Sequence, residues 1–191
     1  MKPLFFTLGL SLSLLMGGCA VSPQSVYLQP QATPTGPSYG QGRAITIKVE
    51  DRRSSSVLGS RGGVYESSSV ITISNDITGA LMIAAQASTA QLGFDGSSSL
   101  APAQLTLILE ELTYDTKTKG LVNTISIDAK ITITTTVGDS SHTGHYRTQR
   151  SHEFSQLPDA QKNQEIISEA LSMSLERGFS DISLANFLGQ N

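Results

Sequence analysis

The single cysteine of this chain, Cys19, is its clearest candidate for a chemically modified residue. Lys2 gives the chain a basic start, an apolar run covers residues 4–16, and two glycines stand directly before the cysteine. This order is typical of a secretory signal peptide that ends at a small-residue cleavage site. A lone cysteine in an exported chain has no intramolecular disulfide partner, so its thiol needs another role.

A membrane-spanning helix is the weaker interpretation of the apolar run. Crossing a hydrocarbon core of about 30 Å takes about 20 apolar residues. Residues 4–16 make a shorter run, which also contains serine and glycine. We therefore predict that residues 1–18 are a signal peptide and that the cut falls before Cys19. A cysteine directly after such a cut resembles a bacterial lipoprotein lipobox, which implies that lipid on this thiol holds the chain on a membrane. The alternative is a soluble protein with a free thiol near its signal peptide.

A second candidate site is the charged segment that follows the first predicted strand. Here Asp51, Arg52 and Arg53 stand next to one another. An arginine guanidinium binds a carboxylate or a phosphate with a planar fork of donors, so Arg52 and Arg53 are candidate partner contacts. The competing interpretation is that these arginines form local ion pairs at the end of the strand.

The remaining polar residues give no recognisable catalytic or metal-binding pattern. His142 and His145 are three residues apart, a spacing that suits a metal on a helix or a tight turn, but they straddle a predicted hairpin. The chain contains no Gly-x-Ser-x-Gly motif, and Glu110, Glu111 and Asp115 lack the spacing of a calcium loop. We predict no enzyme activity, no metal and no cofactor.

Composition narrows the class of protein further. The formal net charge is −3, so the chain lacks the basic surface that nucleic-acid binding requires. It contains no tryptophan, which argues mildly against a carbohydrate platform or an aromatic-rich interface. The length suits one domain with a sizeable core.

The segment behind the cysteine is rich in proline, glutamine, serine and glycine. This composition is typical of a linker. We predict that residues 19–43 comprise the lipidated cysteine and a flexible tether, and that residues 44–191 form a single periplasmic domain.

Hydrophobic periodicity predicts the elements of that domain. Isoleucine and other apolar residues alternate with threonine and charged residues over 121–137, which is typical of a strand with one buried and one wet face. Helical spacing covers 76–92 and the segment after Pro158, and 182–188 is expected to form a short last helix. The other expected strands are 44–49, 70–73, 103–114 and 143–154.

These elements follow the order β-β-α-β-β-β-α. The strands and helices partly segregate along the chain, which favours an α+β fold. We predict a mostly antiparallel sheet with two helices packed on one face. The long strands between 121 and 154 leave a polar edge, which a partner could extend by strand addition. The competing interpretation, which the threonine and lysine residues of the outer face favour, is that this face is simply solvated.

Several segments together resemble the YajG family of Gram-negative bacterial lipoproteins. They are the lipobox around Cys19, the proline-rich stretch, the segments 112–115 and 119–120, the alternating strand 125–133, and a last helix ending near Phe187 and Leu188. The resemblance implies lipid attachment at Cys19, and no catalytic residue. Ala20 after the cysteine implies sorting to the outer membrane, with the domain facing the periplasm. The loop 52–69 is long for such a protein.

Two functions are compatible with these observations. The first is a non-catalytic outer-membrane lipoprotein whose domain acts as an interaction or auxiliary module and binds an unknown envelope protein. The second is a binder of a small hydrophobic or glycan ligand, which would lie in a groove between the helices and the sheet. The alanine-rich helix 76–92 leaves space for such a groove. A hydrolase is the weakest hypothesis, since no nucleophile motif is present.

Overall fold

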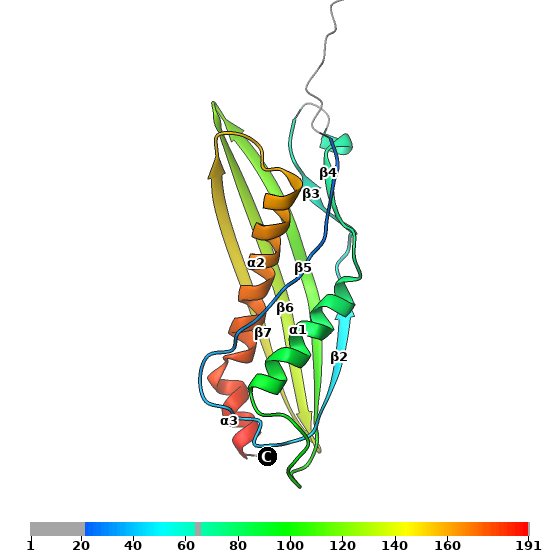
Figure 1. Cartoon of the computed structure of the whole chain (residues 1–191), viewed down its shortest axis with the longest axis vertical. Helices are drawn as coiled ribbons and strands as arrows, with labels where there is room; N and C mark the ends of the chain where they lie inside the picture. Colours follow the sequence, from blue (N-terminus) through cyan, green and yellow to red (C-terminus); the bar gives the residue numbers. More distant parts are fainter. Residues whose placement is uncertain (1–21, 64–65, 191) are drawn as a thin grey trace, which may run out of the picture.

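The computed structural model describes residues 22–63 and 66–190, which form one sheet with helices on one face (Figure 1). The elements in chain order are β1 (Gln24–Val26), β2 (Ile45–Asp51), β3 (Val57–Ser60), the short 3₁₀ helix η1 (Glu66–Ser68), β4 (Val70–Ile73), α1 (Ile77–Gln91), β5 (Ala103–Lys119), β6 (Val122–Val137), β7 (Ser140–Phe154), α2 (Ala160–Phe179) and α3 (Ile182–Gln190).

Three long antiparallel strands form the body of the sheet. β5 pairs with β6 from Ala103↔Val137 to Lys119↔Val122, and β6 pairs with β7 from Val137↔Ser140 to Asn123↔Phe154. On the side away from β6, β5 pairs in parallel with β2 along its first half and with β3 at Tyr114. β3 then pairs with β4, and β4 with β1.

The α+β class is confirmed, but the sheet is mixed and has two strands that the sequence did not predict. β1–β4, β2–β5 and β3–β5 are parallel pairs, so only the long strands and the β3–β4 pair are antiparallel. The sequence predicts a loop at β3, because serine and glycine surround it. Its glycine is required by packing, since a Cβ on Gly59 would lie 1.7 Å from the Tyr114 carbonyl oxygen.

The alternating pattern of β6 produces the two faces that the sequence predicts. Its isoleucines at 125, 127, 131 and 133 are buried beneath the helices, whereas Thr124, Ser126 and Lys130 are half-buried on the other face. α1 packs on β2, and α2 packs on β6 and β7, so both helices cover the same face (Figure 1). The opposite face of the long strands, termed the open face below, is covered by no helix from the part of the chain that the structure describes.

The helix ends follow the expected capping chemistry. The Asp76 carboxylate accepts the Thr78 amide at 3.0 Å, and the Asp159 carboxylate accepts the Lys162 amide at 2.8 Å. Each bond satisfies a first-turn amide that has no partner within its helix. Gly93, with φ +85°, turns the chain out of α1, and α3 extends the predicted short last helix to Gln190.

The prediction of a flexible tether is wrong for residues 22–43. We term this segment the strap, because it crosses the helical face between α1 and α2 (Figure 1). Val26, Leu28 and Tyr39 are buried in the core, and Gln24–Val26 pairs with β4. The folded domain therefore includes the strap and does not begin at Ala44. Proline-rich composition misled the prediction because prolines also suit an extended, buried segment.

Candidate functional site

The helical face of the sheet holds the groove in which the sequence predicted a ligand. In the structure, the strap fills much of that groove. Alternate strap residues point inward, as expected for extended chain. Val26, Leu28, Pro30 and Pro34 are buried, while the residues between them are exposed or half-buried. The expectation of an empty groove between the helices and the sheet is therefore incorrect along the strap.

Polar side chains at four-residue intervals along α2 accept backbone amides of the strap. Gln164 Oε1 accepts the Tyr27 amide at 3.2 Å, Ser168 Oγ accepts the Gln29 amide at 3.3 Å, and Ser172 Oγ accepts the Gln31 amide at 2.9 Å. Ser180 Oγ continues the series at the Thr35 amide, at 2.8 Å. We call these four acceptors the rungs.

The spacing of the rungs follows from elementary geometry. Four helical residues rise about 6.0 Å, and two extended residues rise about 6.6 Å, so every second strap amide meets a new helical turn. The polar residues at four-residue intervals in α2, together with the alternating apolar residues of the strap, were a signal that the sequence interpretation missed.

Other contacts hold the strap to α1. The Asn75 side chain accepts the Leu28 amide at 2.9 Å and donates to the Leu28 carbonyl at 2.8 Å, so one amide group satisfies both backbone groups of one residue. Ser38 Oγ and the Gly40 amide both donate to the Leu92 carbonyl, at 2.6 and 2.8 Å. The strap is therefore attached at both ends of α1.

A buried polar network fastens the start of the strap. The Tyr114 hydroxyl donates to Asn163 Oδ1 at 2.9 Å, and Asn163 is fully buried and in contact with the Gln24 side-chain amide. Arg61 donates to the Ser22 carbonyl at 2.8 Å and to the Pro158 carbonyl at 3.1 Å. Burial raises the pKa of Tyr114, so its hydroxyl keeps the proton that it donates.

The far end of the strap lies over the C-terminal end of α2. The Tyr39 hydroxyl donates to the Phe179 carbonyl at 2.9 Å, and Tyr146 donates to Asp181 at 2.6 Å. Burial raises the pKa of both tyrosines, with a smaller contribution from the negative charge of Asp181. Both hydroxyls therefore act as donors.

A cavity of about 380 Å³ remains between the strap and α1. Leu28, Pro30, Ala80 and the exposed side chains of Tyr27 and Ile83 line it. Its volume lies in the lower part of the about 300–1,000 Å³ that ligand sites in proteins occupy. Its lining comes from the strap, α1 and the residues just before α1, so it lies beside the strap and not in the predicted groove between the helices and the sheet.

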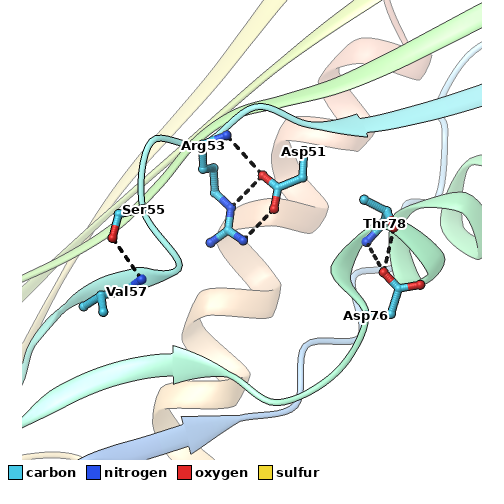
Figure 2. A network of polar contacts seen from close by, with 6 residues as sticks. All are labelled: Asp51, Arg53, Ser55, Val57, Asp76 and Thr78. Carbon is cyan, nitrogen blue, oxygen red and sulfur yellow. Dashed lines mark hydrogen bonds and ion pairs between the residues drawn. The ribbon is translucent and has the colours of Figure 1, made fainter.

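The structure brings Arg52 and Arg53 into ion pairs with their own strand (Figure 2 shows the Arg53 pair). Arg53 binds both carboxylate oxygens of Asp51 at 2.7–2.9 Å, and its side chain is only 9% exposed. This hydrogen bonding holds the pKa of Asp51 below its usual value. Arg52 pairs with Glu50 at 2.6 Å and stays 57% exposed, so only Arg52 presents much surface to a partner.

The three histidines do not converge. His142 stacks on Phe187 with ring centroids 5.8 Å apart, His145 Nδ1 hydrogen-bonds Thr132 Oγ1 at 2.8 Å, and His152 lies farther along β7. Within residues 22–63 and 66–190, no group of three or more histidine, cysteine, aspartate or glutamate side chains is arranged to hold a metal ion.

The open face carries hydrogen-bonded side-chain pairs between neighbouring strands. Arg147 Nε donates to both carboxylate oxygens of Asp128 at 2.7 and 2.9 Å, and Gln149 donates to the same group at 2.8 Å. The hydrogen bonds from Arg147 hold the pKa of Asp128 below its usual value, despite partial burial. Thr134 and Thr143 hydroxyls meet at 3.0 Å. This face is polar and internally paired.

The outer edge of β7 is the longest terminal edge of the sheet. β7 is last in the strand order and runs for 15 residues. Among the described residues, Arg177 of α2 donates to the Arg147 carbonyl from outside the sheet. Along an edge strand, the N–H and C=O groups of successive residues point alternately toward the neighbouring strand and away from it. The backbone groups of the other odd-numbered residues of β7 therefore also point away from β6.

A comparison with family models decides the family. The model described as "Uncharacterized lipoprotein" matches residues 30–189. The chain belongs to this lipoprotein family, of the YajG type. The lipoprotein contains no helix, among its described residues, that is long and apolar enough to cross a membrane. Cys19 lies outside the described residues, so its lipid attachment stays a prediction.

Solved structures provide further similarities for this lipoprotein. A protein from Xanthomonas campestris assigned to the family DUF330 is 8% identical, with a TM-score of 0.44, 88% of this chain covered and 97% of that chain. A minor lipoprotein from Acinetobacter baumannii is 11% identical, with a TM-score of 0.38 and coverages of 75% and 91%. The comparison with curated proteins gives no match.

Proposed function

We propose that this lipoprotein is a non-catalytic interaction module, anchored by lipid on Cys19 in the outer membrane with its domain facing the periplasm. Its partner is an envelope protein that adds a strand to the outer edge of β7. The observation that carries this proposal is that edge, 15 residues long, at the end of the strand order. Long unpaired edges are templates for pairing, and folded proteins usually cover them.

The anchor has support from the family and from the sequence. The family model that matches this chain describes lipoproteins, and Cys19 follows a signal-peptide pattern. Stable membrane attachment by lipid takes more than one acyl chain, which a modified N-terminal cysteine carries in such proteins. The choice of outer over inner membrane is based on Ala20, which follows the cysteine.

Replacing the cysteine tests the anchor. Cys19→Ala is expected to give a protein that is either soluble in the periplasm or retained with its signal peptide. Membrane fractionation and the mass of the N-terminal peptide measure this outcome. A Cys19→Ala protein that is still processed and still bound to the outer membrane would contradict lipid anchoring.

Proline substitution tests the edge. Ser151 and Arg147 are four residues apart in β7, so the backbone groups of both point away from β6. Proline at 151 therefore removes a donor from the outer edge without breaking the β6–β7 pairing. Ser151→Ala is the matched control, because it removes the same hydroxyl and keeps the amide. A photo-reactive residue at Glu153 on β7, followed by mass spectrometry, reports the partner in cells.

We expect one dominant crosslinked protein with the native chain and with Ser151→Ala, and loss of most of it with Ser151→Pro. Equal crosslinking by Ser151→Pro, in a protein with native circular dichroism, would argue against strand addition. Crosslinks to many proteins in equal amounts would argue against a specific partner.

The cavity beside α1 supports a second candidate, a small hydrophobic or glycan ligand. Tyr27 and Ile83 frame about 380 Å³ of space open to solvent. Native mass spectrometry of protein purified from membranes is expected to show bound lipid or glycan if this candidate holds. An Ile83→Glu variant should lose that mass, whereas an Ile182→Glu variant on α3 should keep it.

A further inference from the structure

The strap sets how far the domain can stand from the lipid on Cys19. The Ser22 carbonyl is bound by Arg61, and β1, which begins two residues later, pairs with β4, so the chain is attached to the domain from Ser22 onward. Cys19 precedes Ser22 by three residues. Three residues span at most about 11 Å when fully extended. The end of the molecule that holds Ser22 therefore faces the membrane closely.

The same end of the molecule carries the turn between β5 and β6. Figure 1 shows this turn and the start of the strap at one end of the long axis, with α3 at the other. The turn presents Leu121, which is 89% exposed, and Val122, which is 42% exposed. Lys119 is exposed directly before the turn. The Lys117 side chain is 81% exposed and forms only a long ion pair, at 3.6 Å, with the exposed Asp115 carboxylate.

This turn differs from the other exposed apolar positions. Among the described residues, Leu121 is the most exposed of the large apolar side chains, and Leu121 and Val122 are adjacent. Ile182 is also exposed and stands alone on α3, whereas Ile83 on α1 lies with Tyr27 at the cavity described above. Single exposed apolar residues are normal on protein surfaces, whereas an apolar tip beside basic side chains suits the boundary between phosphate headgroups and acyl chains.

We propose that the β5–β6 turn enters the headgroup region of the leaflet that holds the Cys19 lipid. Leu121 and Val122 contact the upper acyl chains, and the ammonium groups of Lys117 and Lys119 face lipid phosphates. The occupant of this apolar tip is thus the phospholipid surface itself. The proposal rests on the lipid anchor proposed above and adds an orientation, with the long axis of the sheet rising from the membrane.

The chain contains no tryptophan, so one introduced tryptophan reports its own surroundings. The experiment uses the full, acylated protein in vesicles of phosphatidylethanolamine and phosphatidylglycerol, with and without brominated acyl chains. Leu121→Trp places the probe in the turn. Ile182→Trp is the matched control, because Ile182 is 74% exposed and lies on α3 toward the opposite end.

We expect brominated lipid to quench most of the emission of Leu121→Trp and to leave Ile182→Trp unchanged. Flotation of the vesicles measures anchoring separately. If the protein floats and neither probe is quenched, the orientation is wrong while the anchor stands. If Ile182→Trp is quenched instead, the opposite end faces the lipid. If the acylated protein does not float, the anchor fails and the proposed orientation fails with it.

Discussion

The two faces of the sheet satisfy their polar groups in different ways. On the helical face, the strap buries its apolar side chains, and its backbone amides donate hydrogen bonds to the rungs of α2. On the open face, polar side chains pair with one another, as Asp128 does with Arg147, and most of them remain half-buried or exposed to water. The first face excludes solvent, and the second tolerates it.

This difference shows that burial and partners, more than composition, decide whether a segment is ordered. The strap has the proline and glutamine content of a linker, yet Leu28 is fully buried. The open face is rich in threonine, as strands often are, yet most of its side-chain hydrogen bonds are accessible to water and must compete with it. We therefore expect the helical face to carry the stability of the domain, and the open face to tolerate substitution.

Truncating the inward side chain of the strap should have the largest effect. Leu28→Ala removes a fully buried side chain, and such changes cost about 2–5 kcal/mol of unfolding free energy. Thr134→Ala on the open face is the control, with an expected change within about 0.5 kcal/mol. Urea unfolding of both variants measures the difference, and equal losses would remove the distinction between the faces.

Breaking the buried network at the start of the strap should have the next largest effect. Asn163→Ala removes the acceptor of the Tyr114 hydroxyl and one partner of the Gln24 side chain, at a cost of about 1–3 kcal/mol. Gln164→Ala, one residue along α2, removes one rung and should cost less. Thermal unfolding that ranks Gln164→Ala as the more harmful change would show that the network matters little.

Removing a single rung should loosen the strap locally. Ser172→Ala deprives the Gln31 amide of its acceptor, a loss of about 0.5–1.5 kcal/mol. Hydrogen exchange of that amide should accelerate, while exchange in β6 stays unchanged. Gln161→Ala, a change on α2 that removes no rung, serves as the control. Unchanged exchange at Gln31 would mean that this bond contributes nothing measurable.

The smallest expected effect is on the open face, and it depends on pH. The folded pKa of Asp128 is lowered by hydrogen bonds from Arg147, so the pair stabilises the protein above the unfolded pKa of about 3.9. That contribution is lost as the pH falls through the folded pKa. Because the Arg147 side chain is 53% exposed, solvent screens the pair, and the contribution amounts to about 1 kcal/mol.

Urea unfolding at a series of pH values measures this contribution. Between neutral and acidic pH, the unfolding free energy of Asp128→Asn is expected to fall by less than that of the native chain. In the background of Arg147→Gln, the same aspartate substitution should change the pH dependence much less. An identical pH dependence of the native chain and Asp128→Asn would rule out a stabilising pair.

Much of the fold could be predicted because its patterns are local. The alternation in 121–137 predicted β6, and the helical spacing in 76–92 predicted α1 within a residue or so at each end. The family was also identified from the residues, and the match over 30–189 confirms it. These signals need no knowledge of distant contacts.

The errors concern segments whose structure depends on distant partners. β3 pairs with β4 and touches β5, and neither contact is visible in the segment 57–60 itself. The strap needs the rungs of α2, which lie more than 130 positions away in the chain. At the charged segment after β2, the ion pair of Arg53 with Asp51 could be predicted, because the two residues are only two positions apart. The burial of Arg53 could not be predicted from the segment itself.

The separation between the strap and α2 also has a consequence for the order of folding. Tyr27 and Gln164 are 137 positions apart, and Thr35 and Ser180 are 145 apart. Contacts of such high sequence separation close large loops and form slowly. During synthesis, the strap emerges first among the described residues, and α2, which supplies the rungs, emerges nearly last. The groove between α1 and α2 therefore stays open until the chain is almost complete, and closing it is a late step of folding.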